Sequence, residues 1–467
     1  MKNKDKALGA LVVALNGIYL AWLSVHVEGL GGSLLFIAET LIASLSLLFL
    51  INHWSQHHVR HTKVAASGSV DIFLPVVNEP LSIFERTLKA ATAIEYMWKT
   101  IYVLDDGSRA EIKKLAQKYG ATYVARSIHN DRKAGNLNFG LEHSDGDFIL
   151  VLDADQVAKP AIIKDILGYF QSNSRLAIVT LRQHFDVPKN DFNHDTLFYQ
   201  HMQAGKNADN AAISCGSGVF YRRSALEEIN GFQTWNIVED LYTSYVLHAH
   251  GFLSLYINKP YTLGLAPQDL SEIYQQRGTW AVDTLRLFFR RSPLFFKGFT
   301  LRQRLHYFEI GWAYIVSATA IPIIFILPIV TMYLNLHIIS DERTYILLRV
   351  PSLLPILYLY YSLSGNSFST SQFWASFFPV NMKALALAVL PFKVNYRVTN
   401  KLAGVGKRDI MLIFPHLILA CTGVWVLVWR VTAVDHHLTF FTGLNMIWIF
   451  LMLFWFYPVI KKGLLLE

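Results

Sequence analysis

Residues 147–155 read DFILVLDAD, and this stretch decides the fold of the segment around it. An unbroken apolar run that ends in acidic residues is typical of a strand buried on both faces of a parallel sheet. Similar runs occur at 71–77 (DIFLPVV) and 100–106 (TIYVLDD). Because polar helical stretches separate these runs, residues 66–267 are predicted to form a doubly wound α/β domain.

The rest of the chain is unusually apolar. Of its 467 residues, 53% are hydrophobic and only 16% are charged, whereas about a quarter is usual in soluble proteins. Apolar runs near the roughly 20 residues that a membrane helix needs predict six spans, near 7–26, 32–52, 308–334, 344–364, 409–431 and 438–459. Aromatic and basic residues mix at 268–305, and aromatic ones gather at 368–390, which predicts helices lying in the membrane interface.

Lys and Arg near the span ends predict the orientation. They gather before the first span, at 57–63, at 395–408 and after the last span, which places these segments and the α/β domain on the cytoplasmic side of the plasma membrane. The predicted organisation is two spans (1–65), the cytoplasmic α/β domain (66–267), interfacial helices (268–306), two spans (307–366), an interfacial helix with a loop (367–408) and two spans (409–467).

Charge and cysteine content exclude other classes. The formal net charge is +8, but no nucleic-acid-binding motif accompanies it and the basic residues flank apolar runs, so we expect a bilayer and no nucleic acid as partner. Two cysteines exclude a disulfide framework. The first apolar run has no polar region after it and is followed at once by a second, so no cleavable signal peptide is expected.

Pairs of carboxylates follow two predicted strands. Asp153 and Asp155 end the run at 147–155, and residues two apart on a strand point to the same side. At the carboxyl end of a parallel strand that side can face a ligand crevice, where two carboxylates can hold Mg²⁺ or Mn²⁺ beside a diphosphate. Asp105 and Asp106 follow another run and suit hydrogen bonds to a base or ribose, although carboxylates in such turns also cap helices.

A lysine and an acidic pair lie at the starts of two predicted helices. Lys133 precedes the stretch LNFGLEH, and its charge adds to the favourable dipole at a helix start, so a diphosphate fits there. Glu239 and Asp240 begin another helix, where capping alone explains one carboxylate. We expect Asp240 to act as the general base that takes a proton from an acceptor hydroxyl.

Two further motifs suit a sugar. Trp280 can stack on the apolar face of a pyranose, although a tryptophan in a protein core is also ordinary. Cys215 and Gly216 lie in the small-residue stretch 214–218, which lets a sugar approach the backbone or serves only as a turn.

In this order the motifs resemble those of the processive glycosyltransferases that include cellulose, hyaluronan, chitin and poly-N-acetylglucosamine synthases. The resemblance covers roughly residues 66–300 and rests on the ordered set at 105–107, 133–136, 153–155, 215–217, 239–240 and 276–280. It implies a GT-A-like domain within a membrane bundle, a UDP-sugar donor and a divalent metal. It also implies acceptor contacts from Cys215, Gly216, Glu239, Gln276 and Trp280.

One motif resembles cellulose synthases in particular. Residues 396–401 (YRVTNK) match the gating loop of that group, which implies that Thr399 and Lys401 reach the diphosphate when the loop closes. The family pattern Gln-x-x-Arg-Trp departs at Thr279, which replaces the arginine expected at the diphosphate, so Arg277 or Arg286 is the candidate replacement. We do not expect the cyclic-dinucleotide-binding module of many bacterial cellulose synthases, or regulation through it, within this chain.

The function expected from these features is inverting, processive transfer of glucose from UDP-glucose to a β-glucan. The linkage is cellulose-like, (1,3) or mixed (1,3;1,4), and the product leaves through the enzyme's own spans, with or without accessory secretion subunits. Three alternatives stay open: a hyaluronan-, chitin- or poly-N-acetylglucosamine-type synthase, a non-processive transferase with a lipid acceptor, and a non-catalytic membrane scaffold or transporter. The sugar and the linkage do not follow from the residues.

Overall fold

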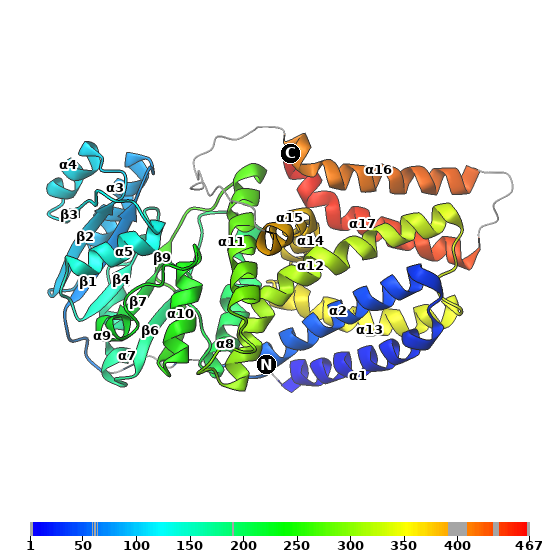
Figure 1. The fold of residues 1–467 in the computed structure, drawn as a ribbon, viewed down its shortest axis with the longest axis horizontal. Coiled ribbons are helices and arrows are strands. Elements are labelled where there is room, and N and C mark those ends of the chain that lie inside the picture. Colours follow the sequence, from blue (N-terminus) through cyan, green and yellow to red (C-terminus); the bar gives the residue numbers. More distant parts are fainter. Residues whose placement is uncertain are drawn as a thin grey trace.

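The computed structural model describes residues 3–57, 59, 62, 64–188, 191–390, 409–432 and 439–464. A sheet with its covering helices occupies one end of the molecule, and long helices that run side by side occupy the other (Figure 1). Helix α11 (Leu270–Arg290) lies between the two parts.

The main sheet has seven strands in the order β3-β2-β1-β4-β7-β6-β8. Their bounds are β1 (Val70–Val76), β2 (Lys99–Asp105), β3 (Thr122–Val124), β4 (Phe148–Val151), β6 (Leu176–Arg182), β7 (Val219–Arg222) and β8 (Leu253–Pro260). Strand β1 pairs in parallel with β2 and β4, whereas β7 is antiparallel to both β4 and β6. The three predicted strands β1, β2 and β4 are therefore parallel, as expected, and the sheet as a whole is mixed because of β7. A second, two-stranded sheet pairs β5 (Val157–Ala158) with β9 (Thr262–Leu263).

Helices cover both faces of the main sheet, as predicted. On one face α3 (Leu81–Thr92), α4 (Ala110–Lys118), α6 (Ile162–Ile166) and α7 (Gly168–Gln171) bury their apolar side chains in one core. On the other face α5 (Arg132–Glu142), α9 (Arg223–Glu228) and α10 (Glu239–Ala249) contribute to a second core. This arrangement brings the N-terminal ends of α5 and α10 to the edge where the functional motifs gather.

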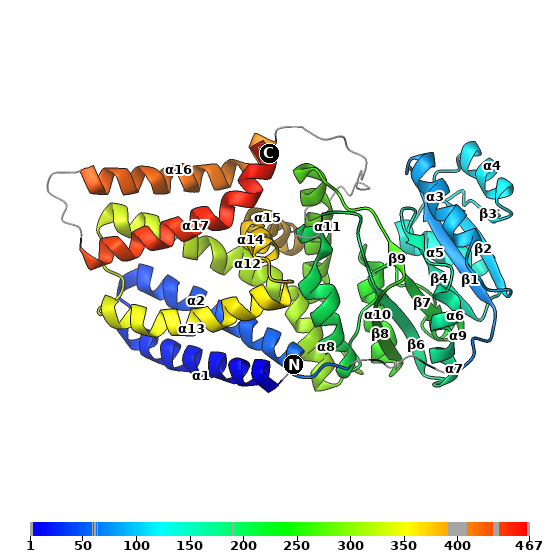
Figure 2. The same cartoon turned by 180° about the vertical axis from the view of Figure 1, so that it is seen from behind.

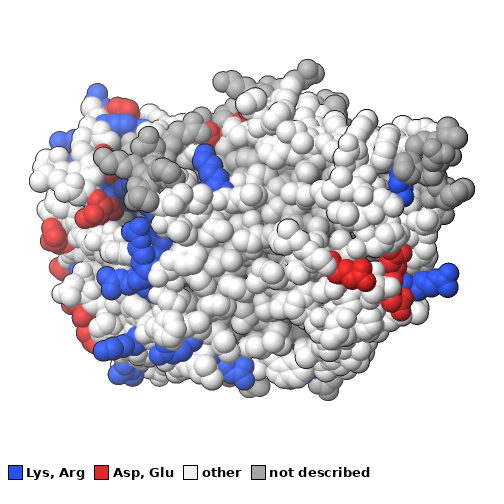
Figure 3. Space-filling view, turned by 45° about the vertical axis from the view of Figure 1, so that its right-hand side comes forward, with Lys and Arg blue, Asp and Glu red and all other residues white. Residues whose placement is uncertain are grey.

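Among the described residues, six helices are long and apolar enough to cross a membrane, and they lie at the positions of the six predicted spans. They are α1 (Asn3–His26), α2 (Gly29–Trp54), α12 (Leu301–Leu334), α13 (Glu342–Leu363), α16 (Ile410–Thr432) and α17 (Phe440–Leu464). Helix α1 begins and α17 ends on the side of the bundle that faces the sheet (Figures 1 and 2). Charged side chains gather at the two ends of the molecule and leave a broad uncharged band over the helices between them (Figure 3).

Shorter helices lie at the junction of the two parts. Helices α14 (Ser369–Ser376) and α15 (Phe378–Val389) lie beside α11 and against the end of the bundle (Figures 1 and 2). The aromatic stretches 268–305 and 368–390 are thus helical over most of their length, as predicted, and their position in the membrane interface stays a prediction.

Candidate active site

The ammonium group of Lys133 joins three of the predicted motifs. It lies 2.7 Å from Oδ1 of Asp153 and 3.4 Å from Oε1 of Glu239, and it donates a hydrogen bond of 2.8 Å to the carbonyl oxygen of Gly216. Lys133 occupies the first turn of α5, and Glu239 and Asp240 begin α10, as predicted. Residues far apart in the sequence therefore meet at one point.

Burial raises the pKa of two carboxyl groups of this cluster, Asp240 and Glu239. Burial raises the pKa of Asp240 to about 7, with a further contribution from the negative charge of Glu239, while Lys133 opposes the shift. Burial also raises the pKa of Glu239 against the opposing effect of Lys133. For Lys133 burial lowers the pKa, but the charges of Asp153 and Glu239 outweigh it and the net shift is upward. A carboxylate with a pKa near neutrality is suited to proton transfer.

Gly216 brings the backbone close to both Asp240 and Lys133. Its φ angle is +76°, a left-handed conformation that favours glycine. A Cβ at this position would lie 3.1 Å from Oδ2 of Asp240 and 3.1 Å from Nζ of Lys133. The neighbouring thiol of Cys215 accepts a hydrogen bond from Gln203, and burial raises its pKa, so it stays protonated at neutral pH.

Asp153 and Asp155 follow β4 but do not belong to it. The strand ends at Val151, so Asp153 and Asp155 are not strand residues as predicted, and strand alternation does not set the direction of their side chains. The backbone N–H of Asp153 donates to Oγ of Ser217, and Oδ2 of Asp155 accepts from the N–H of Leu265. The turn after the strand, tied by these two hydrogen bonds, sets the direction of each side chain.

These two carboxylates are chemically suited to a hard divalent cation, which prefers oxygen ligands. Within the described part of the chain, no group of three or more His, Cys, Asp or Glu side chains is placed to hold a metal ion. Because Mg²⁺ is usually bound by one or two carboxylates together with substrate phosphates, the donor set fits a cation that arrives with a nucleotide diphosphate.

The two carboxylates after β2 have internal partners. Asp105 is fully buried and accepts hydrogen bonds from the N–H groups of Gly107 and Arg109 and from the hydroxyl of Tyr123. Asp106 pairs with Arg126 at 2.5 Å and with His129 at 2.9 Å. Burial alone would raise the pKa of Asp106, but the hydrogen bonds and charges of Arg126 and His129 together outweigh it, so the pKa lies below its usual value. The predicted contacts of Asp105 and Asp106 with a base or ribose stay predictions.

The other predicted residues lie on α11 or outside the described residues. Gln276 is half-buried on α11, and Trp280 on the same helix is 36% exposed. The guanidinium of Arg277 pairs with Asp195, and Arg286 lies 3.6 Å from Asp283. The hydroxyl of Thr279 donates to the carbonyl oxygen of Gln275. The gating-loop motif at 396–401, with Thr399 and Lys401, belongs to a segment (392–402) that we expect to act as a lid over the donor, and it lies outside the described residues.

Sequence reasoning missed several supporting residues. Asp195 bonds to Arg277, and Gln183 bonds to the 214–218 loop. Ser217 bonds to Asp153, and Arg126 bonds to Asp106. None of them lies in a recognisable pattern except Ser217, which falls inside the small-residue stretch. Their partners are far away in the sequence, so only the folded structure shows them.

Comparison with known proteins finds two family models and several relatives that are similar to parts of this chain. The model "Glycosyl transferase family 2" matches residues 71–230, and the model "Cellulose synthase" matches residues 227–375. Cellulose synthase 1 of Komagataeibacter xylinus is 28% identical over 86% of this chain. A cellulose synthase catalytic subunit of Pseudomonas fluorescens is 35% identical over 51% of it.

The chain spans only 28% and 34% of the length of these two relatives. The fold has a further match in a solved structure, a mannosyltransferase from Pyrobaculum calidifontis in complex with GDP-Man and Mn²⁺. That match has a TM-score of 0.55 and 16% sequence identity, and it covers 76% of this chain and 98% of the other. The chain therefore has a GT-A-like fold, and it is similar to the family 2 glycosyltransferases over residues 71–230 and to the cellulose synthases over residues 227–375.

Proposed function

We propose that this protein transfers glucose from UDP-glucose to the end of a growing β-glucan, with inversion at the sugar carbon, and passes the polymer through its own membrane helices. The observation that carries the proposal is the cluster of Lys133, Asp153, Glu239 and Asp240 beside Gly216. The match of the chain to cellulose synthases supports the choice of glucan as product.

In the proposed reaction Asp240 takes the proton of the acceptor hydroxyl. The freed oxygen then attacks the anomeric carbon, the bond from that carbon to the diphosphate oxygen breaks, and UDP leaves with the electron pair. A pKa of about 7 leaves Asp240 in part ionised at neutral pH and still basic enough to accept a proton. The nearby positive charge of Lys133 stabilises the departing diphosphate.

Asp153 and Asp155 would hold a Mg²⁺ or Mn²⁺ ion, which neutralises charge on the leaving diphosphate when bound. Lys133 already pairs with Asp153, so the cation and the lysine would share that carboxylate. Asp105 and Asp106 are assigned to the nucleoside side of the donor, with Asp106 directed by Arg126. Thr399 and Lys401 of the proposed lid would contact the diphosphate.

Cys215, Gly216, Glu239, Gln276 and Trp280 are assigned to the acceptor sugar. Trp280 keeps more than a third of its surface exposed, which leaves room for stacking on a pyranose. Glu239 supplies a carboxylate next to the base and can accept a hydrogen bond from an acceptor hydroxyl.

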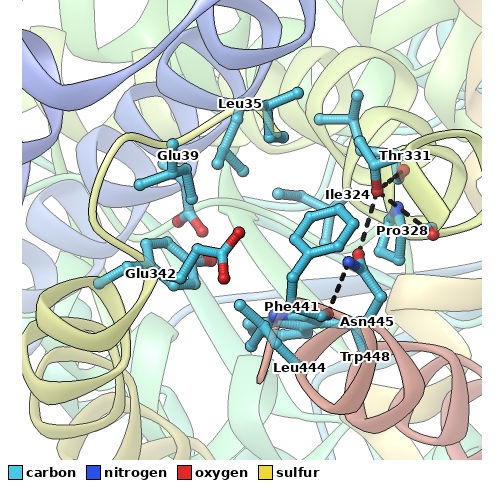
Figure 4. A pocket seen from close by; sticks show the side chains of 14 residues that line it. Leu35, Glu39, Ile324, Pro328, Thr331, Glu342, Phe441, Leu444, Asn445 and Trp448 are labelled. Atoms are coloured by element: carbon cyan, nitrogen blue, oxygen red, sulfur yellow. Dashed lines mark hydrogen bonds between the residues drawn. The ribbon is translucent and has the colours of Figure 1, made fainter. Parts of the chain in front are cut away.

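Polar and charged groups inside the helical bundle support passage of a polymer. Glu39 of α2 forms an ion pair of 2.8 Å with Arg349 of α13, and Thr331 of α12 bonds to Asn445 of α17. Such groups are costly in a membrane and are associated with substrate pathways. A cavity of about 50 Å³ lies among Glu39, Thr331 and Asn445 (Figure 4), which is room for a few water molecules, so side chains there would have to move before a sugar ring passes.

The test is product formation by the purified protein in lipid vesicles with one radiolabelled nucleotide sugar at a time. We expect incorporation from UDP-glucose alone, into a product that a β-glucan-specific hydrolase degrades. The variant Asp240→Asn serves as the inactive control. Incorporation only from UDP-N-acetylglucosamine would instead support a chitin- or poly-N-acetylglucosamine-type synthase, and incorporation into lipid without polymer would support a non-processive transferase.

A further inference from the structure

Arg277 lies between two tryptophan rings and a carboxylate. Its Nη1 donates a hydrogen bond of 2.9 Å to Oδ2 of Asp195. Its guanidinium carbon lies 5.0 Å from the ring centre of Trp280, on the same helix, and 6.0 Å from that of Trp374 on α14. A guanidinium at these distances attracts an aromatic face, so the three side chains restrain one another.

Asp195 is itself held in place by the backbone around it. It follows the short 3₁₀ helix η1 (Phe192–His194) with a φ angle of +46°, and its side chain is 9% exposed. Its N–H donates to the carbonyl oxygen of Phe192. The Phe192 ring stacks on Phe373 of α14 at 3.6 Å between ring centres. These contacts therefore fix the position of the Asp195 carboxylate between η1 and α14.

A chain of hydrogen bonds continues from Asp195 to the loop beside the proposed base. The carbonyl oxygen of Asp195 accepts from the N–H of Tyr199, in the π-helix η2 (Leu197–Met202). The hydroxyl of Tyr199 donates to Oε1 of Gln183, and Nε2 of Gln183 donates to the carbonyl oxygen of Cys215 at 2.8 Å. Short π-helical segments are frequent at functional sites.

We propose that Arg277 and Asp195 are a positioning pair: they hold the ring of Trp280 against the terminal sugar of the polymer and fix its place relative to the Cys215–Gly216 loop. The proposal rests on the proposed function, since it assumes a sugar acceptor at Trp280. In this proposal Arg277 positions Trp280, whereas the sequence led us to expect a contact between Arg277 and the diphosphate. The guanidinium charge is already matched by Asp195, and its side chain is only 15% exposed.

The two tasks differ in what the loss of Arg277 changes. A positioning residue acts through Trp280, so its removal impairs transfer to the polymer while UDP binds as before. A diphosphate ligand contacts UDP directly, so its removal weakens UDP binding. The ratio of free glucose released to glucose incorporated adds a second readout, because a poorly held acceptor leaves the donor to react with water.

The experiment uses the full chain in lipid vesicles and compares Arg277→Ala, Arg277→Lys, Asp195→Asn, Trp280→Ala and the double variant Arg277→Ala/Trp280→Ala. Arg290→Ala, at the exposed end of the same helix, is the matched control. UDP affinity, glucan formation and free glucose are measured for each. Only variants with the expression level and the unfolding temperature of the wild type are compared. If Arg277→Ala does not fold, the experiment relies on Arg277→Lys and Asp195→Asn, because these variants keep the size and the hydrogen-bonding capacity of the side chain.

We expect Arg277→Ala and Asp195→Asn to lower glucan formation by about tenfold, which corresponds to the loss of a desolvated cation–aromatic contact. The UDP affinity should stay unchanged, and the share of free glucose should increase. In the Trp280→Ala background Arg277→Ala should add almost nothing, because both changes remove the same contact. Three results would each overturn the proposal. They are weaker UDP binding in Arg277→Ala, additive losses of glucan formation in the double variant, and wild-type glucan formation by both Arg277→Ala and Asp195→Asn. Absence of glucan from the wild-type protein would instead refute the proposed function.

Discussion

Replacement of Asp240 by Asn removes the proposed base and keeps the size of its side chain. Asp240 begins α10, and its pKa of about 7 results first from burial and then from the charge of Glu239. Asn has the same shape but cannot take a proton from the acceptor. We expect the rate of transfer to fall by about 10²–10⁴-fold, the usual contribution of general base catalysis.

The same pKa predicts how the folded state responds. When folding raises the pKa of a carboxyl group, the folded protein becomes less stable as pH increases between the two pKa values. For Asp240 these are about 4 in the unfolded chain and about 7 in the folded protein. At about 1.4 kcal/mol per pH unit, this destabilisation has an upper bound of about 4 kcal/mol above pH 7. Asp240→Asn lacks this charge, so it should unfold at a higher temperature than the wild type at pH 8 and at a similar temperature at pH 4.

The assay measures initial rates of glucan formation from pH 5 to 9, together with UDP affinity and thermal unfolding. For the wild type we expect the rate to rise as pH passes through 7, when Asp240 loses its proton. The variant should bind UDP normally, be at least as stable at pH 8 and show no such rise. A variant rate within tenfold of the wild type, or a pH profile that is the same for both proteins, would refute the role of Asp240 as the base.

The remaining predictions concern the metal, the glycine and the lid. Excess chelator should abolish turnover, and full activity in chelator would exclude a role for the metal. Mn²⁺ should bind detectably only when UDP is present, which electron paramagnetic resonance can follow. Asp153→Asn or Asp155→Asn should weaken that binding. Gly216→Ala should lower activity by at least about tenfold with a folded protein, because a φ of +76° and a Cβ only 3.1 Å from Lys133 and Asp240 disturb the cluster, and an active variant would show that the loop adapts. Thr399→Ala and Lys401→Gln should each reduce polymer formation, and UDP should protect residues 392–402 from protease; wild-type synthesis with unchanged cleavage would leave only a topological role for this basic loop.

Local runs of apolar residues made much of the architecture predictable. The six spans and the buried strands at 71–77 and 100–106 are set by continuous apolar runs, which depend only on the local sequence. The antiparallel strand β7 was not predictable, because direction depends on pairing with β4 and β6 far away in the chain. The strand at 147–155 ends earlier than expected, since the turn after Val151 is tied to Ser217 and Leu265.

The site was predictable to the level of motifs and no further. Lys133, Asp153 and Glu239 do meet, as an ordered set of strand and helix ends predicts. The partner of Arg277 was not predictable, because Asp195 lies in an irregular segment without a pattern of its own. A motif shows which residue types are needed, whereas their pairing depends on how α11 packs against η1 and α14.

The most direct test of the account is the side of the membrane on which the product appears. Sealed vesicles would carry the purified protein with its α/β domain outward, verified by protease access, and UDP-glucose would be supplied outside. We expect labelled glucan inside the vesicles, resistant to an added β-glucanase until detergent opens them, and none from Asp240→Asn. Polymer that the glucanase degrades without detergent would contradict synthesis coupled to passage through the enzyme's own helices.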